Sequence, residues 1–67
     1  MFKAYERKSV IFHSDTIEEL NNIVANMLKR LKEEDGIVET LSNIHQNSDD
    51  EVTFIQTLDY AVPIIKL

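Results

Sequence analysis

Cysteine is absent from this sequence, and glycine and proline occur once each. Without cysteine the chain has no disulfide and no thiolate metal site. A single glycine excludes the glycine-rich loops that cradle phosphate groups, and it leaves no composition for a flexible linker. The 67 residues are too few for two domains, so we expect residues 1–67 to form one domain.

Long apolar runs and an excess of basic charge are also missing. No apolar run reaches the 18 residues of a membrane-spanning helix, and residues 1–8 contain no apolar signal core. The sequence has seven basic and twelve acidic residues. The resulting net charge of −5 opposes the phosphate contacts on which nucleic-acid binding depends. The lack of cysteine fits a reducing compartment. We therefore expect a cytoplasmic protein that binds neither DNA nor a membrane.

Small size limits how stable a single copy can be. A domain of about 60 residues buries only about 60% of the surface that its unfolded chain exposes. Below roughly 70–80 residues, one core seldom supplies more than about 3–5 kcal/mol of stability. Disulfides and thiolate-bound metals are excluded, so self-association is the remaining source of stability. The sequence therefore predicts a homodimer.

An amphipathic helix is predicted over residues 16–34. Apolar residues recur there at three- and four-residue steps, which place them on one stripe of a helix. Thr16 or Asp15 can cap the start, because each precedes a glutamate by three positions. Gly36 is expected to end the helix in the left-handed conformation. The apolar stripe comprises Ile17, Leu20, Ile23, Val24, Met27, Leu28 and Leu31.

β-Branched and aromatic residues predict three strands around this helix. The strands cover residues 9–13, with 2–8 as an outward extension, then 37–46 and 51–62. Residues 47–50 form a polar turn too short for a parallel crossover, so the last two strands form an antiparallel hairpin. We expect the third strand, the most evenly apolar, to lie in the centre. The fold class is then α+β, strand–helix–strand–strand, with a small antiparallel sheet and one covering helix.

One helix covers only one face of such a sheet. The opposite face should carry Ile11, Ile55 and either Val38 or Ile44. Three strands also leave two edges without a neighbour. Face-to-face packing or extension of the sheet in a two-fold dimer would cover these surfaces.

The residues that could carry catalysis or bind a metal do not form a site in the sequence. His13 and His45 lack the further donors that a metal site needs, and Ser14 beside His13 does not make a triad. Asp49 and its acidic neighbours lack the spacing of a calcium loop. A chain of this size has little interior for a pair of acid–base carboxylates. We therefore expect no enzymatic activity, no metal and no cofactor.

A basic segment near the N-terminus is the strongest candidate for a binding site. Lys3, Arg7 and Lys8 lie within the first eight residues, which contain one acid. Arginine can grip a phosphate or carboxylate, and the ring of Tyr5 can stack on a base. The same charges would also serve to guard an edge strand. The predicted ligand-binding residues are Lys3, Tyr5, Arg7, Lys8, His45 and Tyr60.

The C-terminal segment 62–67 offers a different kind of surface. It is apolar, and its Pro63 lacks the backbone donor that a central strand uses. The segment would either fold over its own core or cross to a second copy. As a surface for a protein partner it comprises Val62, Pro63, Ile64, Ile65 and Leu67.

The layout resembles two groups of small proteins. Residues 14–20, Ser-Asp-Thr-Ile-Glu-Glu-Leu, open the helix, and residues 36–38, Gly-Ile-Val, follow it. Over residues 9–60 this order is similar to that of very short Firmicute proteins labelled sporulation proteins. In size, acidity and expected dimerisation the chain also resembles small phage proteins that disarm bacterial defences, some of which are homodimeric sponges for nucleotide immune signals.

Two functions follow as hypotheses. The first is a non-enzymatic homodimer of the phage or prophage anti-defence kind, which sequesters a small anionic nucleotide-derived signal through the basic segment. The second is a protein–protein adaptor or regulatory protein of the sporulation-associated kind, which binds its partner through residues 62–67.

Overall fold

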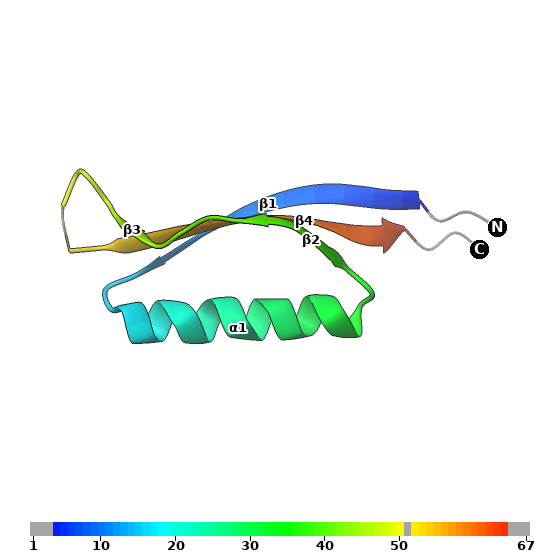
Figure 1. The fold of residues 1–67 in the computed structure, drawn as a ribbon, viewed down its shortest axis with the longest axis horizontal. Helices are drawn as coiled ribbons and strands as arrows, with labels where there is room; N and C mark the ends of the chain where they lie inside the picture. Colours follow the sequence, from blue (N-terminus) through cyan, green and yellow to red (C-terminus); the bar gives the residue numbers. More distant parts are fainter. Residues whose placement is uncertain (1–3, 51, 65–67) are drawn as a thin grey trace.

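The computed structural model describes residues 4–50 and 52–64, and it confirms the predicted α+β fold (Figure 1). The order is strand–helix–strand–strand, with the second predicted strand present as two short pieces. The sheet forms one layer, and the helix lies against it as the other. The elements are β1 (Ala4–Ser14), α1 (Ile17–Glu33), β2 (Ile37–Leu41), β3 (His45–Gln46) and β4 (Phe54–Ile64).

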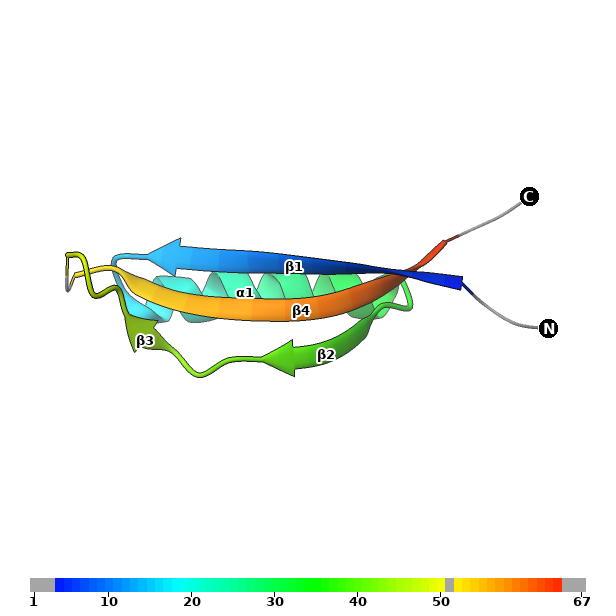
Figure 2. The ribbon, with the colours of Figure 1, turned by 90° about the horizontal axis from the view of Figure 1, so that it is seen from above.

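β4 lies in the centre of the sheet, as the sequence predicts. It pairs antiparallel with β1 on one side and with β2 and β3 on the other (Figure 2). All eleven residues of β1 pair with β4, from Ala4 opposite Ile64 to Ser14 opposite Phe54. The polar residues 4–8 therefore extend the same strand as the apolar residues that follow them.

The helix begins where the sequence predicts because Thr16 caps it. The side-chain oxygen of Thr16 accepts a hydrogen bond from the Glu19 N–H at 3.1 Å, which gives a partner to an N–H that the helix itself leaves without one. Of the two alternative caps, the structure contains this one. Acidic residues in the first turn and basic residues in the last complement the helix dipole.

The C-terminal end of α1 differs from the prediction by one residue. Asp35, and not Gly36, has the left-handed conformation, with a φ of 59°. The Gly36 N–H donates to the Leu31 carbonyl at 2.7 Å, which is the longer bond of a Schellman turn. Glycine is needed at position 36 because a Cβ there would lie 2.9 Å from Leu31 Cδ2 and 3.3 Å from the Ala61 carbonyl oxygen. Contacts with Leu31 of the helix and with Ala61 of β4 therefore favour glycine at position 36, while Asp35 has the left-handed conformation.

The core lies between the sheet and the apolar stripe of α1. Leu20 and Leu31 of the helix and Leu58 of the central strand are fully buried, so they join the two layers. Ile17, at the first position of α1, departs from the predicted stripe and is exposed. The rest of the core consists of buried Phe12 and Val24 and of half-buried Val10, Ile23, Met27, Leu28, Ile44, Phe54, Tyr60 and Val62.

β2 contains a bulge that changes which residues share a face. Val38 pairs with Tyr60 and Thr40 pairs with Asp59, so Glu39 is an extra residue between them. Tyr60 packs against the core. Val38 therefore lies on the helix side of the sheet, and the expectation that it lies on the opposite face is wrong.

Residues 42–44 interrupt the predicted second strand between β2 and β3. The Thr57 N–H donates to the Ser42 hydroxyl at 2.9 Å, and the Gln56 side chain donates to the Ser42 carbonyl at 2.8 Å. Side chains thus replace part of the backbone ladder here. The irregular segment turns Ile44 onto the core, so the open-face position expected for it is also wrong.

β1 and β4 project beyond the end of α1 towards the two termini (Figure 1). A strand of eleven residues spans about 36 Å, whereas a helix of seventeen spans only about 25 Å. Residues 61–64, which include the start of the predicted tail, continue β4 and pair with residues 4–7. Pro63 fits a central strand here because the pairing with β2 stops at Ala61.

The molecule is elongated and has more surface than its mass predicts. Its radius of gyration is 14.1 Å, compared with about 11 Å for a compact domain of this length. Its accessible surface is 5283 Å², whereas a monomeric protein of 7.8 kDa exposes about 4400 Å². A single copy therefore exposes roughly 900 Å² more than is usual for its mass.

Candidate functional site

One face of the sheet has no covering layer. Figure 1 shows α1 against one face, and none of the other elements in residues 4–50 and 52–64 lies over the opposite one. Successive residues of a strand alternate between faces, so the register identifies the residues that point away from the helix. We define the open face as the odd-numbered residues of β1 and β4 together with Ile37, Glu39, Thr40 and His45.

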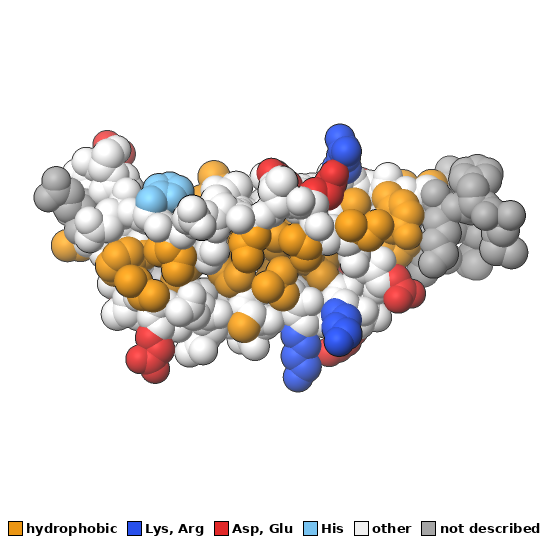
Figure 3. All heavy atoms as spheres, viewed as in Figure 1, with side chains coloured by type: hydrophobic (Ala, Val, Ile, Leu, Met, Phe, Trp, Pro, Cys, Tyr) orange, Lys and Arg blue, Asp and Glu red, His pale blue; other side chains and the backbone are white. Residues whose placement is uncertain are grey.

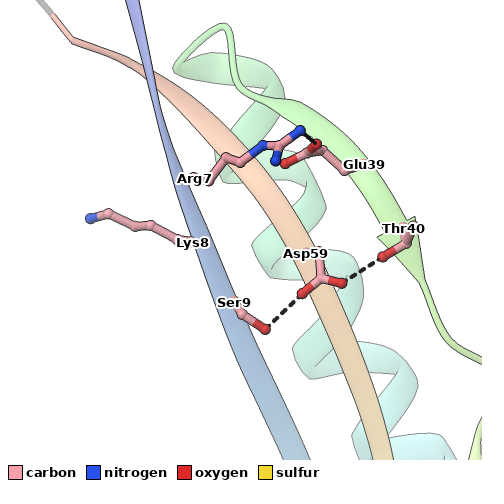
Figure 4. A pocket seen from close by; sticks show the side chains of 6 residues that line it. All are labelled: Arg7, Lys8, Ser9, Glu39, Thr40 and Asp59. Atoms are coloured by element: carbon pink, nitrogen blue, oxygen red, sulfur yellow. Dashed lines mark hydrogen bonds and ion pairs between the residues drawn. The ribbon is translucent and has the colours of Figure 1, made fainter.

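Asp59 lies in the middle of the open face and ties three strands together (Figure 4). Its carboxylate accepts one hydrogen bond from the Ser9 hydroxyl of β1 and one from the Thr40 hydroxyl of β2, both at 2.7 Å. These two hydrogen bonds lower the pKa of Asp59 below its usual 3.8. The bond from Ser9 has the larger effect and the bond from Thr40 the smaller. Asp59 is therefore ionised at neutral pH, with its charge shared between two donors.

Arg7 and Glu39 form an ion pair beside Asp59. Arg7 Nη2 lies 3.0 Å from Glu39 Oε2, and the bulge in β2 brings Glu39 to this position. The Arg7 side chain is 82% exposed. An ion pair this exposed contributes little to stability, so the guanidinium can exchange it for a carboxylate or phosphate of a binding partner.

A shallow hollow of about 370 Å³ lies between β1 and β2 over these residues (Figure 4). On the open face its charged lining consists of one basic and two acidic side chains, because the Lys8 side chain extends away from the hollow. The hollow therefore provides hydrogen-bonding groups of both kinds but no strong attraction for an anion. Its lining residues are Arg7, Lys8, Ser9, Glu39, Thr40 and Asp59.

The structure divides the predicted basic segment between two faces. Arg7 and the exposed ring of Tyr5 lie on the open face. The Lys8 side chain extends away from Arg7 and has its Nζ 3.7 Å from a Glu6 oxygen (Figure 4). Lys3 lies outside the residues that the structure describes. Alternation along one continuous strand causes the division, because neighbouring residues point to opposite sides.

The other two predicted ligand-binding residues lie far from each other. His45 pairs with Ile55 and lies towards the loop end of the open face. Tyr60 packs against the core on the helix side, so its ring contributes to stability and not to the open face. Of the five predicted residues that are described, Tyr5, Arg7 and His45 share the open face, while Lys8 and Tyr60 do not.

The predicted partner-binding tail is also divided by the alternation of β4. Val62 packs against the core, whereas Pro63 pairs with Tyr5 at the end of the open face. Ile64 is exposed at the last position of the strand. Ile65 and Leu67 fall outside the described residues.

Apolar side chains are also exposed along the β2 edge, between the sheet and α1. Figure 3 shows a row of apolar patches between the two layers, along the part of the molecule that is drawn in colour. Val38 and Leu41 of β2 are exposed there, and Ile17 is exposed at the start of the helix. This band is a second surface where apolar groups meet water.

A polar hollow at the opposite end of the molecule lies between the end of β1 and the loop before β4. Its Asp50 carboxylate accepts hydrogen bonds from the Thr53 hydroxyl at 2.7 Å and from the N–H groups of Thr53 and Val52. These bonds lower the pKa of Asp50, the Thr53 side chain being the main cause. The Asp50 carboxylate therefore stabilises the conformation of its own loop.

Sequence reasoning did not identify Ser9, Glu39, Thr40 and Asp59 as members of a site. Ser9 and Asp59 lie 50 positions apart, and only the register of β1 against β4 brings them together. The bulge that places Glu39 on the open face cannot be recognised from the pattern of apolar and polar residues in the sequence. The available signal was the alternation along residues 4–14, which separates Arg7 from Lys8 once the segment is treated as one strand.

No group of three histidine, aspartate or glutamate residues in the described part of the chain is placed to hold a metal ion. Within the same residues, no helix has the length and apolar character needed to cross a membrane. Comparisons with protein-family models, with curated proteins and with solved structures found no match.

Proposed function

We propose that this chain is a non-enzymatic adaptor, a homodimer that binds a partner protein through the open face of its sheet. The composition of that face carries the proposal. Ile11 and Ile37 are 57% and 47% exposed there, and Tyr5 and Arg7 lie on the same face. Tyrosine and arginine are enriched at protein interfaces and at the residues that contribute most to binding.

The shape and charge of the face favour a protein over a small ligand. Sites for small molecules are concave and bury roughly 70–90% of the ligand's surface. The hollow beside Arg7 is shallow, and the carboxylates of Glu39 and Asp59 lie in its wall. A flat surface with exposed isoleucines is better matched by another protein, whose carboxylate would replace that of Glu39 on Arg7.

Two neighbouring residues of β2 provide a matched test. Ile37 lies on the open face and Val38 on the helix side, and the two are similarly exposed, at 47% and 44%. We expect wild type and Val38→Asp to capture the same partner from the native cells, in the same molar ratio of partner to chain. Ile37→Asp should not capture it. Retention by Ile37→Asp and loss with Val38→Asp would instead assign the interface to the band along the β2 edge.

A second candidate function is the capture of a small anionic ligand, and the exposure of Arg7 favours it. The resemblance to phage anti-defence proteins implies a nucleotide-derived signal as that ligand. Native mass spectrometry would then show a nucleotide that remains bound to Lys8→Ala but is lost from Arg7→Ala, because Lys8 points away from the open face. Purified protein that carries no nucleotide and binds none when cyclic or linear nucleotides are added would exclude this candidate.

A further inference from the structure

The outer edge of β1 is long, and among the usual protecting features it has only the charged residues 6–8. β1 has eleven residues without proline or bulge, and no described element pairs with its outer side. The opposite edge is protected, because β2 has only five residues, contains a bulge, and is separated from β3 by irregular residues. Short strands and bulges discourage pairing with another chain, whereas a long regular edge invites it.

The register shows which backbone groups of β1 face outwards. The Thr57 carbonyl accepts from the Ser42 N–H, so the odd-numbered residues of β4 direct their backbone groups towards β2. In an antiparallel ladder the alternate, even-numbered residues then bond to β1. They pair with even-numbered residues of β1, such as Val10 opposite Leu58. Ser9, Ile11 and His13 therefore present their N–H and C=O groups along the free edge.

The side chains of β1 protect only part of this edge. Charged residues occupy positions 6–8, whereas residues 9–14 contain none. Val10 and Phe12 pack towards the core, and Ile11 is exposed on the open face. The half of the strand nearest the helix start therefore offers a regular, uncharged edge, at which a second strand would meet no repulsion.

The surface area of the chain matches what such a contact requires. The molecule exposes roughly 900 Å² more than is usual for its mass, and a stable interface buries roughly 800 Å² on each partner. The two areas are similar in size, so a contact with one further copy would bring each chain near the exposed area usual for its mass.

We propose that β1 pairs antiparallel with β1 of a second copy, with Ile11 opposite Ile11 of the other chain. The pairing rests on the homodimer of the proposed function and assigns its interface. In this register Val10 faces Phe12 of the second copy, Ser9 faces His13 and Lys8 faces Ser14, so no like charges oppose each other. The hydrophobic pattern favours this register over those that set Glu6 or Lys8 against the apolar residues.

The pairing makes one continuous sheet from the two copies. Ile11 lies on the open face of both chains, so the two helices lie on the same side and the two open faces join into one surface. The two Ile11 side chains meet at its centre. The binding surface of the adaptor is then twice as wide as one copy provides, and both copies contribute Tyr5 and Arg7 to it.

Lysine substitutions at the two edges test this interface. Ile11 and Ile37 are both exposed open-face isoleucines, one on the β1 edge and one on the β2 edge, so each should accept lysine without loss of the fold. Ile11→Lys would place two ammonium groups opposite each other, and we expect it to weaken dimerisation at least about tenfold. Ile37→Lys should leave dimerisation unchanged. Sedimentation equilibrium measures both, with circular dichroism to confirm the fold.

Disulfide cross-linking gives an independent readout, since the natural sequence contains no cysteine. Mild oxidation should link Ile11→Cys into a covalent dimer and leave Ile37→Cys as single chains. A wild type that dimerises, together with cross-linking through position 37 and not 11, would overturn the β1 interface but retain the homodimer. A wild type that sediments as a folded single copy would overturn both.

Discussion

Replacing Asp35 by glycine is expected to stabilise the protein. Asp35 has a φ of 59°, and the left-handed conformation costs a residue with a Cβ about 1–2 kcal/mol. Glycine removes that cost, but its extra freedom in the unfolded chain costs about 0.5–1 kcal/mol. We expect a net increase of about 0.5–1 kcal/mol in the free energy of unfolding. For a domain of this size, this raises Tm by about 3–6 °C.

The neighbouring substitution Gly36→Ala should have the opposite effect. The new Cβ would lie 2.9 Å from Leu31 Cδ2 and 3.2 Å from the Leu31 carbonyl oxygen. Leu31 is fully buried, so its side chain cannot move away without disturbing the core. Overpacking of this kind costs about 1–3 kcal/mol.

Thermal unfolding followed by circular dichroism, at one fixed protein concentration, measures both effects. Asp35→Asn is the control, because it removes the charge near the negative end of the helix dipole but keeps a Cβ. We expect Asp35→Asn to raise Tm by less than Asp35→Gly does. A lower Tm for Asp35→Gly together with an unchanged Tm for Gly36→Ala would refute the reasoning, since it would contradict both the left-handed conformation of Asp35 and the close contacts at position 36.

Three further predictions concern the core, the helix start and the open face. Leu58→Ala should cost about 2–5 kcal/mol, most of the stability of a chain this small, and its urea midpoint should fall accordingly. Thr16→Ala should cost about 1 kcal/mol in the same assay, because the Glu19 N–H loses its acceptor. The lowered pKa of Asp59 means that its contribution to stability is complete above the ordinary value of 3.8 and is lost as the pH falls through the lower folded-state value. The difference in urea midpoint between wild type and Asp59→Asn should therefore be larger at pH 6 than at pH 3, and an equal difference at both would contradict the role of the charge.

The sequence predicts the parts of the fold that depend on local patterns. The helix follows from its 3.6-residue stripe and the Thr16 cap, and both appear in the structure. The central position of β4 follows from its even apolar character. These features need no knowledge of distant residues.

The sequence does not predict features that depend on contacts between distant segments. The second strand is interrupted where Ser42 accepts two hydrogen bonds across the sheet, one from the Gln56 side chain to its carbonyl and one from the Thr57 N–H to its hydroxyl. Part of the space beside Gly36 is taken by the carbonyl oxygen of Ala61, 25 positions later, 3.3 Å from where a Cβ would lie. A helix-capping pattern contains neither contact.

The candidate site shows the same division. The chemistry of Tyr5 and Arg7 was enough to select them as candidate binding residues. The cluster around them depends on register, because Asp59 meets Ser9 and Thr40 only when three strands align. Arg7 and Lys8 are neighbours in the sequence, but in the structure Arg7 pairs with Glu39 and Lys8 with Glu6, so their charges lie apart.

Amide hydrogen exchange along β1 tests the central claim, that two copies join at this edge, most directly. Val10 and Phe12 donate to β4 in either state, whereas the N–H groups of Ser9, Ile11 and His13 face outwards from a single copy. At micromolar concentration we predict that Ile11 exchanges as slowly as Val10, and that dilution below the dimer dissociation constant makes Ile11 fast. Alternating protection at every concentration, with Val10 and Phe12 slow and Ile11 fast, would contradict the pairing.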